Sequence, residues 1–290
     1  MVNSSLYCNE QINEASLAYA NALNGNLSVY MKNLLASFPA DKRRGLVMAP
    51  YTYFYYKGFD VDIKNQMTPH EYDGGEDIDL YSGSEEAEAR IALNYKSVLD
   101  VYASRWKKAK IVVGLIGITM AAPDDDDDPS AHYAAYVFRR GAGSRQSTLT
   151  YFDSAGWTGN EIYWHAIRGA FPVKHANAIG NVGIFETGGG VSTNEYSYVG
   201  QNIFCHSWAL WFWYQTIDRG LSIEEINELA GKGSLKNQKN LIRIKRFIYN
   251  TLVPKINLKF VSESDKKLFH KCFMGIYLNK KEVTRNIEIE

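Results

Sequence analysis

Apolar positions at helical spacing alternate along the chain with continuous apolar runs. The helical spacing predicts helices over about residues 10–23 and 27–38, the first ended by Asn-Gly-Asn and the second by Pro39. A third helix is expected from Ser84, which precedes two glutamates suited to a helix N-terminus, to about Lys108. The tyrosine- and glycine-rich block over residues 39–83 has no steady period and predicts loops with short strands.

The middle of the chain carries the strand-like runs. The stretch KIVVGLIGITM (110–120) is a continuous β-branched apolar run, which predicts a strand covered on both faces. HYAAYVFRR and STLTYFD are two further runs, and the GAGSRQ between them supplies the glycines of a hairpin loop. The five consecutive aspartates at 124–128 predict a solvated loop, because neighbouring carboxylates splay apart rather than converge on one cation.

Helical patterns return in the last third of the chain. A helix is expected at NEIYWHAIRGA (160–170), a short strand at VGIFET (182–187), and a very apolar helix from Cys205 to about Asp218, ended by Gly220. Charged amphipathic helices follow Leu221. This order predicts an α+β protein with a helical and loop region over 1–110, a strand-rich core over 111–220 and a helical extension over 221–290, which together can form one compact domain.

Composition removes several classes of function. The 290-residue chain has 32 basic and 32 acidic residues and no net charge, which argues against nucleic acid as its main partner. Its three cysteines show no paired spacing, so we expect a reducing compartment and no disulfide framework. No metal-binding pattern of histidine and cysteine occurs, so neither a metal nor a cofactor is predicted. The polar N-terminus and the short apolar segment 111–122 predict no signal peptide and no membrane partner, and therefore an intracellular protein.

Two residues with catalytic side chains stand at the ends of neighbouring strand-like runs. His132 begins one run and Asp153 ends the next. If these strands pair antiparallel, the start of one lies beside the end of the other, which brings an imidazole next to a carboxylate that can orient it. Taken singly, His132 has an ordinary explanation as a solvated strand end and Asp153 as a turn residue.

Cys205 stands at the start of the apolar helix, four residues after Gln201. A thiol with an ordinary pKa of about 8.5 is mostly protonated at neutral pH, and a helix N-terminus and an imidazolium both favour the thiolate. A histidine can then protonate a leaving amine, and the Gln201 amide can donate to an oxyanion. Taken alone, Cys205 is a packed core thiol. His206 is an alternative base, although neighbouring side chains on a helix project about 100° apart, which disfavours direct contact.

The order His, Asp, Gln, Cys resembles that of the adenain-like cysteine peptidases, which include the adenovirus maturation protease, the SUMO proteases and the maturation proteases of large DNA viruses. In particular, QNIFCHSWAL is similar to the Gln…Phe-Cys-x-x-Trp signature of predicted peptidases of giant DNA viruses. The resemblance covers about residues 111–220. It departs from the family at Tyr133, where a tryptophan commonly follows the histidine, and at Phe204 and His206, where SUMO proteases have Asp-Cys-Gly around the nucleophile.

The resemblance implies a papain-like or adenain-like core, with a central mixed or antiparallel sheet and the nucleophile on a buried helix. It implies a base, an orienting acid, an oxyanion donor and a nucleophile at His132, Asp153, Gln201 and Cys205. Substrate is expected to contact Tyr133, Gly189, Gly190 and Trp208. The implied function is a cysteine endopeptidase that matures viral structural proteins at glycine-containing sites, in the host cytoplasm or the virion.

Two other functions stay open at this point. The first is a deconjugase whose partner is a ubiquitin-like protein rather than a viral precursor. The second is a non-catalytic virion protein that keeps the peptidase fold and docks on capsid proteins through its tyrosine-rich N-terminal half and basic C-terminal helices. Activity is favoured because no member of the quartet is replaced, whereas the missing glycine after Cys205 favours the structural protein.

Overall fold

The chain forms two compact units, and each unit combines segments that are far apart in the sequence. The first comprises Met1–Phe38, Gly183–Ser207 and Ala230–Glu290, and the second comprises Pro39–Val182 and Trp208–Leu229. In this computed structural model the described residues are 4–49, 52–57, 60–65, 108–120, 130–142, 145–154, 161–180, 204–230 and 243–278.

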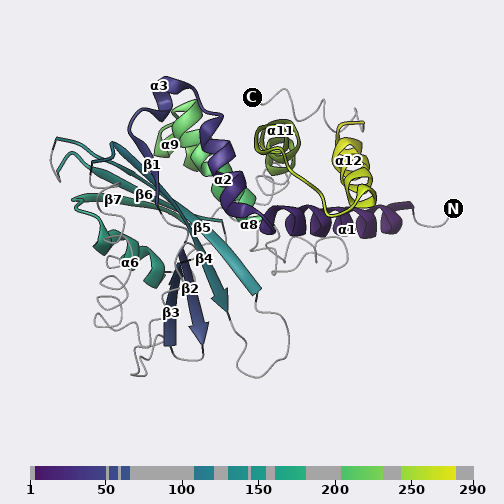
Figure 1. Ribbon diagram of the computed structural model, residues 1–290, viewed down its shortest axis with the longest axis horizontal. Helices are drawn as coiled ribbons and strands as arrows, with labels where there is room; N and C mark the ends of the chain where they lie inside the picture. Colours follow the sequence, from purple (N-terminus) through teal and green to yellow (C-terminus); the bar gives the residue numbers. More distant parts are fainter. Residues whose placement is uncertain are drawn as a thin grey trace. The chain divides into compact units, whose positions relative to one another are not determined.

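A mixed β-sheet is the centre of the second unit (Figure 1). Its strands run in the order β3-β2-β4-β5-β6-β7, and β1 pairs separately with β4. The bounds are β1 (Leu46–Met48), β2 (Thr52–Lys57), β3 (Asp60–Asn65), β4 (Ile111–Met120), β5 (Ser130–Arg139), β6 (Thr148–Asp153) and β7 (His175–Gly180). The α+β class is therefore confirmed, with the apolar run of residues 111–120 as an interior strand paired on both sides.

The hairpin of β5 and β6 is the part of the sheet that the sequence predicted most directly. The two strands pair antiparallel, with Ala134 opposite Asp153 and Tyr136 opposite Tyr151. The short strands β1, β2 and β3 fall within the block 39–83, as expected, together with a one-turn helix, α3 (Ala40–Arg43), that was not. The parallel pairing of β7 with β6 was also missed, because HANAIG has no apolar run and only its partner strand makes it a strand.

Alternation along β6 directs neighbouring side chains to helices on opposite faces of the sheet. The Tyr151 ring packs on Trp164 of α6 (Glu161–Ala170), with ring centroids 5.7 Å apart. The next residue, Phe152, stacks on Phe212 of α8 (Cys205–Trp213), with centroids 5.0 Å apart. This period of two places the sheet between α6 and the Trp208–Trp213 part of α8.

The apolar helix continues beyond α8 as a π-helix, η3 (Tyr214–Arg219), and ends at Gly220, whose φ of 72° is the left-handed conformation of a C-cap. Arg139, at the end of β5, donates from Nη2 to the Thr216 carbonyl at 2.6 Å. Burial lowers the pKa of Arg139, but its ordinary value is high enough to keep the guanidinium charged. The predicted end of this helix is confirmed, whereas its π-helical last turn was not anticipated.

Glycine at position 114 is required by the packing of the sheet. Gly114 lies opposite Tyr136 in the β4–β5 pair, and a Cβ there would overlap the Tyr136 ring. We therefore expect Gly114→Ala to lower the free energy of unfolding by about 1–3 kcal/mol, measured by chemical denaturation. The matched control is Gly25→Ala, whose Cβ would meet only the Asn21 carbonyl at an ordinary 3.5 Å. Equal stability of Gly114→Ala and the wild type would contradict this account.

The first unit is helical and joins the two ends of the chain (Figure 1). The helix α1 (Ser4–Asn24) packs along α12 (Glu263–Leu278), and α2 (Leu27–Ala36) packs on the segment formed by η4 (Phe247–Leu252) and α11 (Val253–Ile256). Asn33 donates from Nδ2 to the Ile256 carbonyl, and the Tyr30 hydroxyl accepts the backbone N–H of Lys259. Residues 1–38 and 230–290 are thus parts of one unit.

Several predicted elements remain untested because they lie outside the described residues. These are the helix over 84–108, the aspartate loop at 124–128 and the strand over 182–187. The helix predicted at 160–170 is confirmed as α6, and the first charged helix after Leu221 is confirmed as α9 (Ile223–Ala230). Within the described ranges, none of the helices has both the length and the apolar character needed to cross a membrane.

Candidate active site

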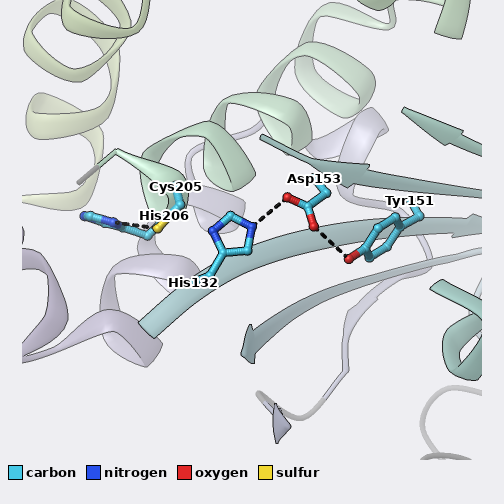
Figure 2. A network of polar contacts seen from close by, with 5 residues as sticks. All are labelled: His132, Tyr151, Asp153, Cys205 and His206. Atoms are coloured by element: carbon cyan, nitrogen blue, oxygen red, sulfur yellow. Dashed lines mark hydrogen bonds and ion pairs between the residues drawn. The ribbon is translucent and has the colours of Figure 1, made fainter. Parts of the chain in front are cut away.

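The β5–β6 hairpin brings His132 and Asp153 into direct contact. Because Ala134 lies opposite Asp153, the side chain two residues earlier on β5 points to the same face at the same end of the sheet. His132 Nε2 lies 2.6 Å from Asp153 Oδ1 (Figure 2). The contact arises from the antiparallel register, although the two residues are 21 positions apart.

Asp153 is held on both carboxylate oxygens. Its side chain is only 1% exposed, and a carboxylate that loses water to this extent needs polar partners. One oxygen contacts His132, and the other accepts a hydrogen bond of 3.3 Å from the Tyr151 hydroxyl (Figure 2). His132 is more accessible, at 14% exposed. The pair therefore presents an oriented imidazole beside a buried acid.

The engagement of Nε2 determines which nitrogen of His132 can take part in proton transfer. A carboxylate accepts a hydrogen bond, so the ring carries its proton on Nε2 when it is neutral. Nδ1 is then the nitrogen that accepts a proton. This is the arrangement in which a carboxylate fixes the tautomer of a general base.

Cys205 is the first residue of α8, as the sequence predicted. Its side chain is buried. Its sulfur lies 4.0 Å from Nδ1 of the neighbouring His206 (Figure 2), although the angle between neighbouring side chains on a helix disfavours such a contact. The helix passes from one unit to the other. Cys205, His206 and Ser207 belong to the first unit, whereas Trp208–Leu229 belong to the second.

The residues around Cys205 pack against the N-terminal helix. The His206 ring stacks on Tyr19 of α1, with centroids 5.9 Å apart and planes 19° apart. The Tyr19 hydroxyl and the Ser207 hydroxyl are hydrogen-bonded at 2.7 Å, and both residues are fully buried. No sequence signal could have joined Tyr19 to Ser207, because they are 188 positions apart. Tyr151 was also missed, although a spacing of two from Asp153 on one strand would have suggested it.

The predicted oxyanion donor, Gln201, and the four residues expected to contact substrate have varied locations. Gln201, Gly189 and Gly190 lie outside the described residues. Tyr133 is buried on β5, where alternation directs it to the face opposite His132. Trp208 is fully buried and packs edge to face on Trp211. A substrate would reach Trp208 only if the residues that cover it moved.

The described part of the chain contains no group of three or more histidine, cysteine, aspartate or glutamate residues that could hold a metal ion. The reactive side chains described at the candidate site are the Cys205 thiol, the His132 and His206 imidazoles and the Asp153 carboxylate.

Comparison with known proteins assigns no family to the chain. No protein-family model and no curated protein matches the sequence, so neither comparison supports the resemblance to adenain-like or giant-virus peptidases. The chain is weakly similar to a crystal structure of the Legionella pneumophila effector protein RavZ, with a TM-score of 0.29 and 13% identity over 82% of this chain. It spans less than two thirds of that RavZ chain, 64%.

A second RavZ structure, RavZ_1-487, gives a TM-score of 0.21 and 13% identity. The match covers 79% of this chain and 74% of that RavZ chain. TM-scores this low establish neither a shared fold nor a shared activity.

Proposed function

We propose that the protein is a cysteine peptidase, in which Cys205 is the nucleophile, His132 the general base and Asp153 the acid that orients it. The observation that carries the proposal is the 2.6 Å contact between His132 and the buried Asp153 at one end of the sheet. Burying a carboxylate costs free energy, and such strained pairs cluster at functional sites. In thiol and serine hydrolases, a buried carboxylate beside an accessible imidazole orients the general base.

The start of α8 supports the assignment of Cys205. Cys205 is the first residue of that helix, and the partial positive charge of a helix N-terminus favours the thiolate over the thiol.

The proposed reaction proceeds in two steps. His132 Nδ1 accepts the proton of the Cys205 thiol, and the sulfur attacks the carbonyl carbon of the scissile bond. The tetrahedral oxyanion accepts hydrogen bonds from the Cys205 backbone N–H and the Gln201 amide, and the amine leaves with the proton held by Nδ1. Water then attacks the thioester, with His132 again as the base, and releases the acid and the free thiol.

For the substrate, we propose a glycine-containing site in a protein. Two substrate classes are consistent with the resemblance in the sequence: viral structural precursors, cleaved in the host cytoplasm or the virion, and conjugates of a ubiquitin-like protein. An electrophile placed at the C-terminus of a ubiquitin-like protein would trap only the second activity. Failure of the chain to hydrolyse either class would favour the non-catalytic structural protein.

The proposal is tested by labelling the cysteines of the native protein with a peptide-linked electrophile and locating the adduct by mass spectrometry. Cys205 is buried, whereas Cys272 is intermediate in exposure. If exposure controlled reactivity, Cys272 would be labelled before Cys205. We expect Cys205 to react at least about tenfold faster, because an oriented imidazole and a helix N-terminus favour its thiolate.

Cys272 is thus the internal control, and the His132→Ala variant is the second, since it should remove the preference for Cys205. Labelling of Cys272 ahead of Cys205 in the native protein would refute an activated thiolate at Cys205.

A further inference from the structure

The first turn of α8 lies on an aromatic cluster that comes from both ends of the chain. Tyr19 is its centre, and its ring contacts His206 and Phe204, which flank Cys205, and Phe269 and Phe273 of α12. The two phenylalanines contact each other, with centroids 4.1 Å apart, and Phe273 also meets Phe204 edge to face. The residues before and after Cys205 are therefore packed against α1 and α12 within one unit.

Tyr19 makes a polar contact as well as a ring contact in this cluster. Its hydroxyl is bonded to Ser207 Oγ at 2.7 Å, and either atom can be the donor. Burial raises the pKa of Tyr19, so the phenol keeps its proton at neutral pH and the bond between the two hydroxyls persists. A fully buried hydroxyl pair is costly to break, because each partner left alone would lack a hydrogen bond.

We propose that Tyr19 is a positioning residue for Cys205, acting through the two residues that follow it, with its ring against His206 and its hydroxyl on Ser207. This inference rests on the proposed function of Cys205. The first turn of a helix has N–H groups without intrahelical partners and frays unless it is held. Tyr19 holds that turn, so the partial positive charge of the helix N-terminus stays aligned with the sulfur.

The expected consequence is a change in the pH at which the Cys205 thiolate forms. Among the described residues, the titratable side chains that the printed ring and cation contacts place in and around the cluster are Tyr19, His206, Lys245 over the Phe273 ring, and Tyr249 and His270 against Phe269. Loss of the Tyr19 hydroxyl lets the first turn fray, so its N–H groups stabilise the thiolate less. We expect Tyr19→Phe to raise the midpoint of thiolate formation and to lower the thiolate fraction below that midpoint by about threefold to tenfold.

The measurement is an ultraviolet titration of the thiolate, taken as the difference between each variant and the same variant carrying Cys205→Ser. This signal requires neither substrate nor access of a reagent to the buried sulfur. A failed peptidase assay would therefore count against the proposed function without deciding the role of Tyr19.

The matched control is Tyr30→Phe, which also removes one buried hydroxyl from the same unit, where it accepts the Lys259 N–H. Ser207→Ala removes the other end of the Tyr19 bond and serves if Tyr19→Phe does not fold. The two changes should be non-additive when combined, since they delete one interaction. A midpoint that stays unchanged in Tyr19→Phe, or that moves equally in Tyr30→Phe, would overturn the proposal.

Discussion

Replacement of Cys205 by alanine is expected to lower kcat/KM for peptide hydrolysis by at least about a thousandfold while the protein stays folded. The sulfur is the attacking atom of the proposed reaction, and neighbouring groups do not replace a lost nucleophile. Hydrolysis of a glycine-containing peptide substrate, with circular dichroism of each variant, measures both parts of the expectation.

Cys272→Ala is the control for this change, because it removes a thiol of the same kind from α12. Its activity should equal that of the wild type. Residual hydrolysis by Cys205→Ala near the wild-type rate would show that another residue is the nucleophile, or that a contaminant carries the activity.

Asp153→Asn is expected to lower kcat by about a thousandfold to ten-thousandfold with little change in KM. An asparagine is nearly the same size, but its amide can donate to His132 Nε2 and so stabilise the tautomer with the proton on Nδ1. That tautomer cannot accept the thiol proton. Steady-state kinetics separate kcat from KM, and Asp41→Asn, a change at an exposed helical position, is the control.

The same variant distinguishes the two imidazoles that could serve as the base of Cys205. If His206 were the base of Cys205, Asp153→Asn would leave kcat nearly unchanged, because the Asp153 carboxylate contacts the imidazole of His132 and would orient that ring. A large loss of kcat in Asp153→Asn, with unchanged activity in Asp41→Asn, would assign the proton transfer to His132.

The hairpin that carries His132 and Asp153 was predictable because its information is local. The two runs alternate, the glycine-containing loop between them is short, and antiparallel pairing then places the start of β5 beside the end of β6. The helix that begins at Cys205 and ends at Gly220 was predictable for the same reason, as an apolar run with a C-cap residue. The strand β7 was not, because its sequence lacks the pattern and only parallel pairing with β6 forms it.

The surroundings of Cys205 followed from no local pattern. Tyr19 reaches Ser207 across 188 positions, and α1 packs on α12 from the opposite end of the chain, so both ends of the chain belong to one unit. Periodicity and turn residues report on neighbours along the chain, and from them alone this sequence specified its hairpin, its apolar helix and the chemistry at their ends. Burial and packing between distant segments decide which side chains surround these residues, and both arise only when the whole chain folds.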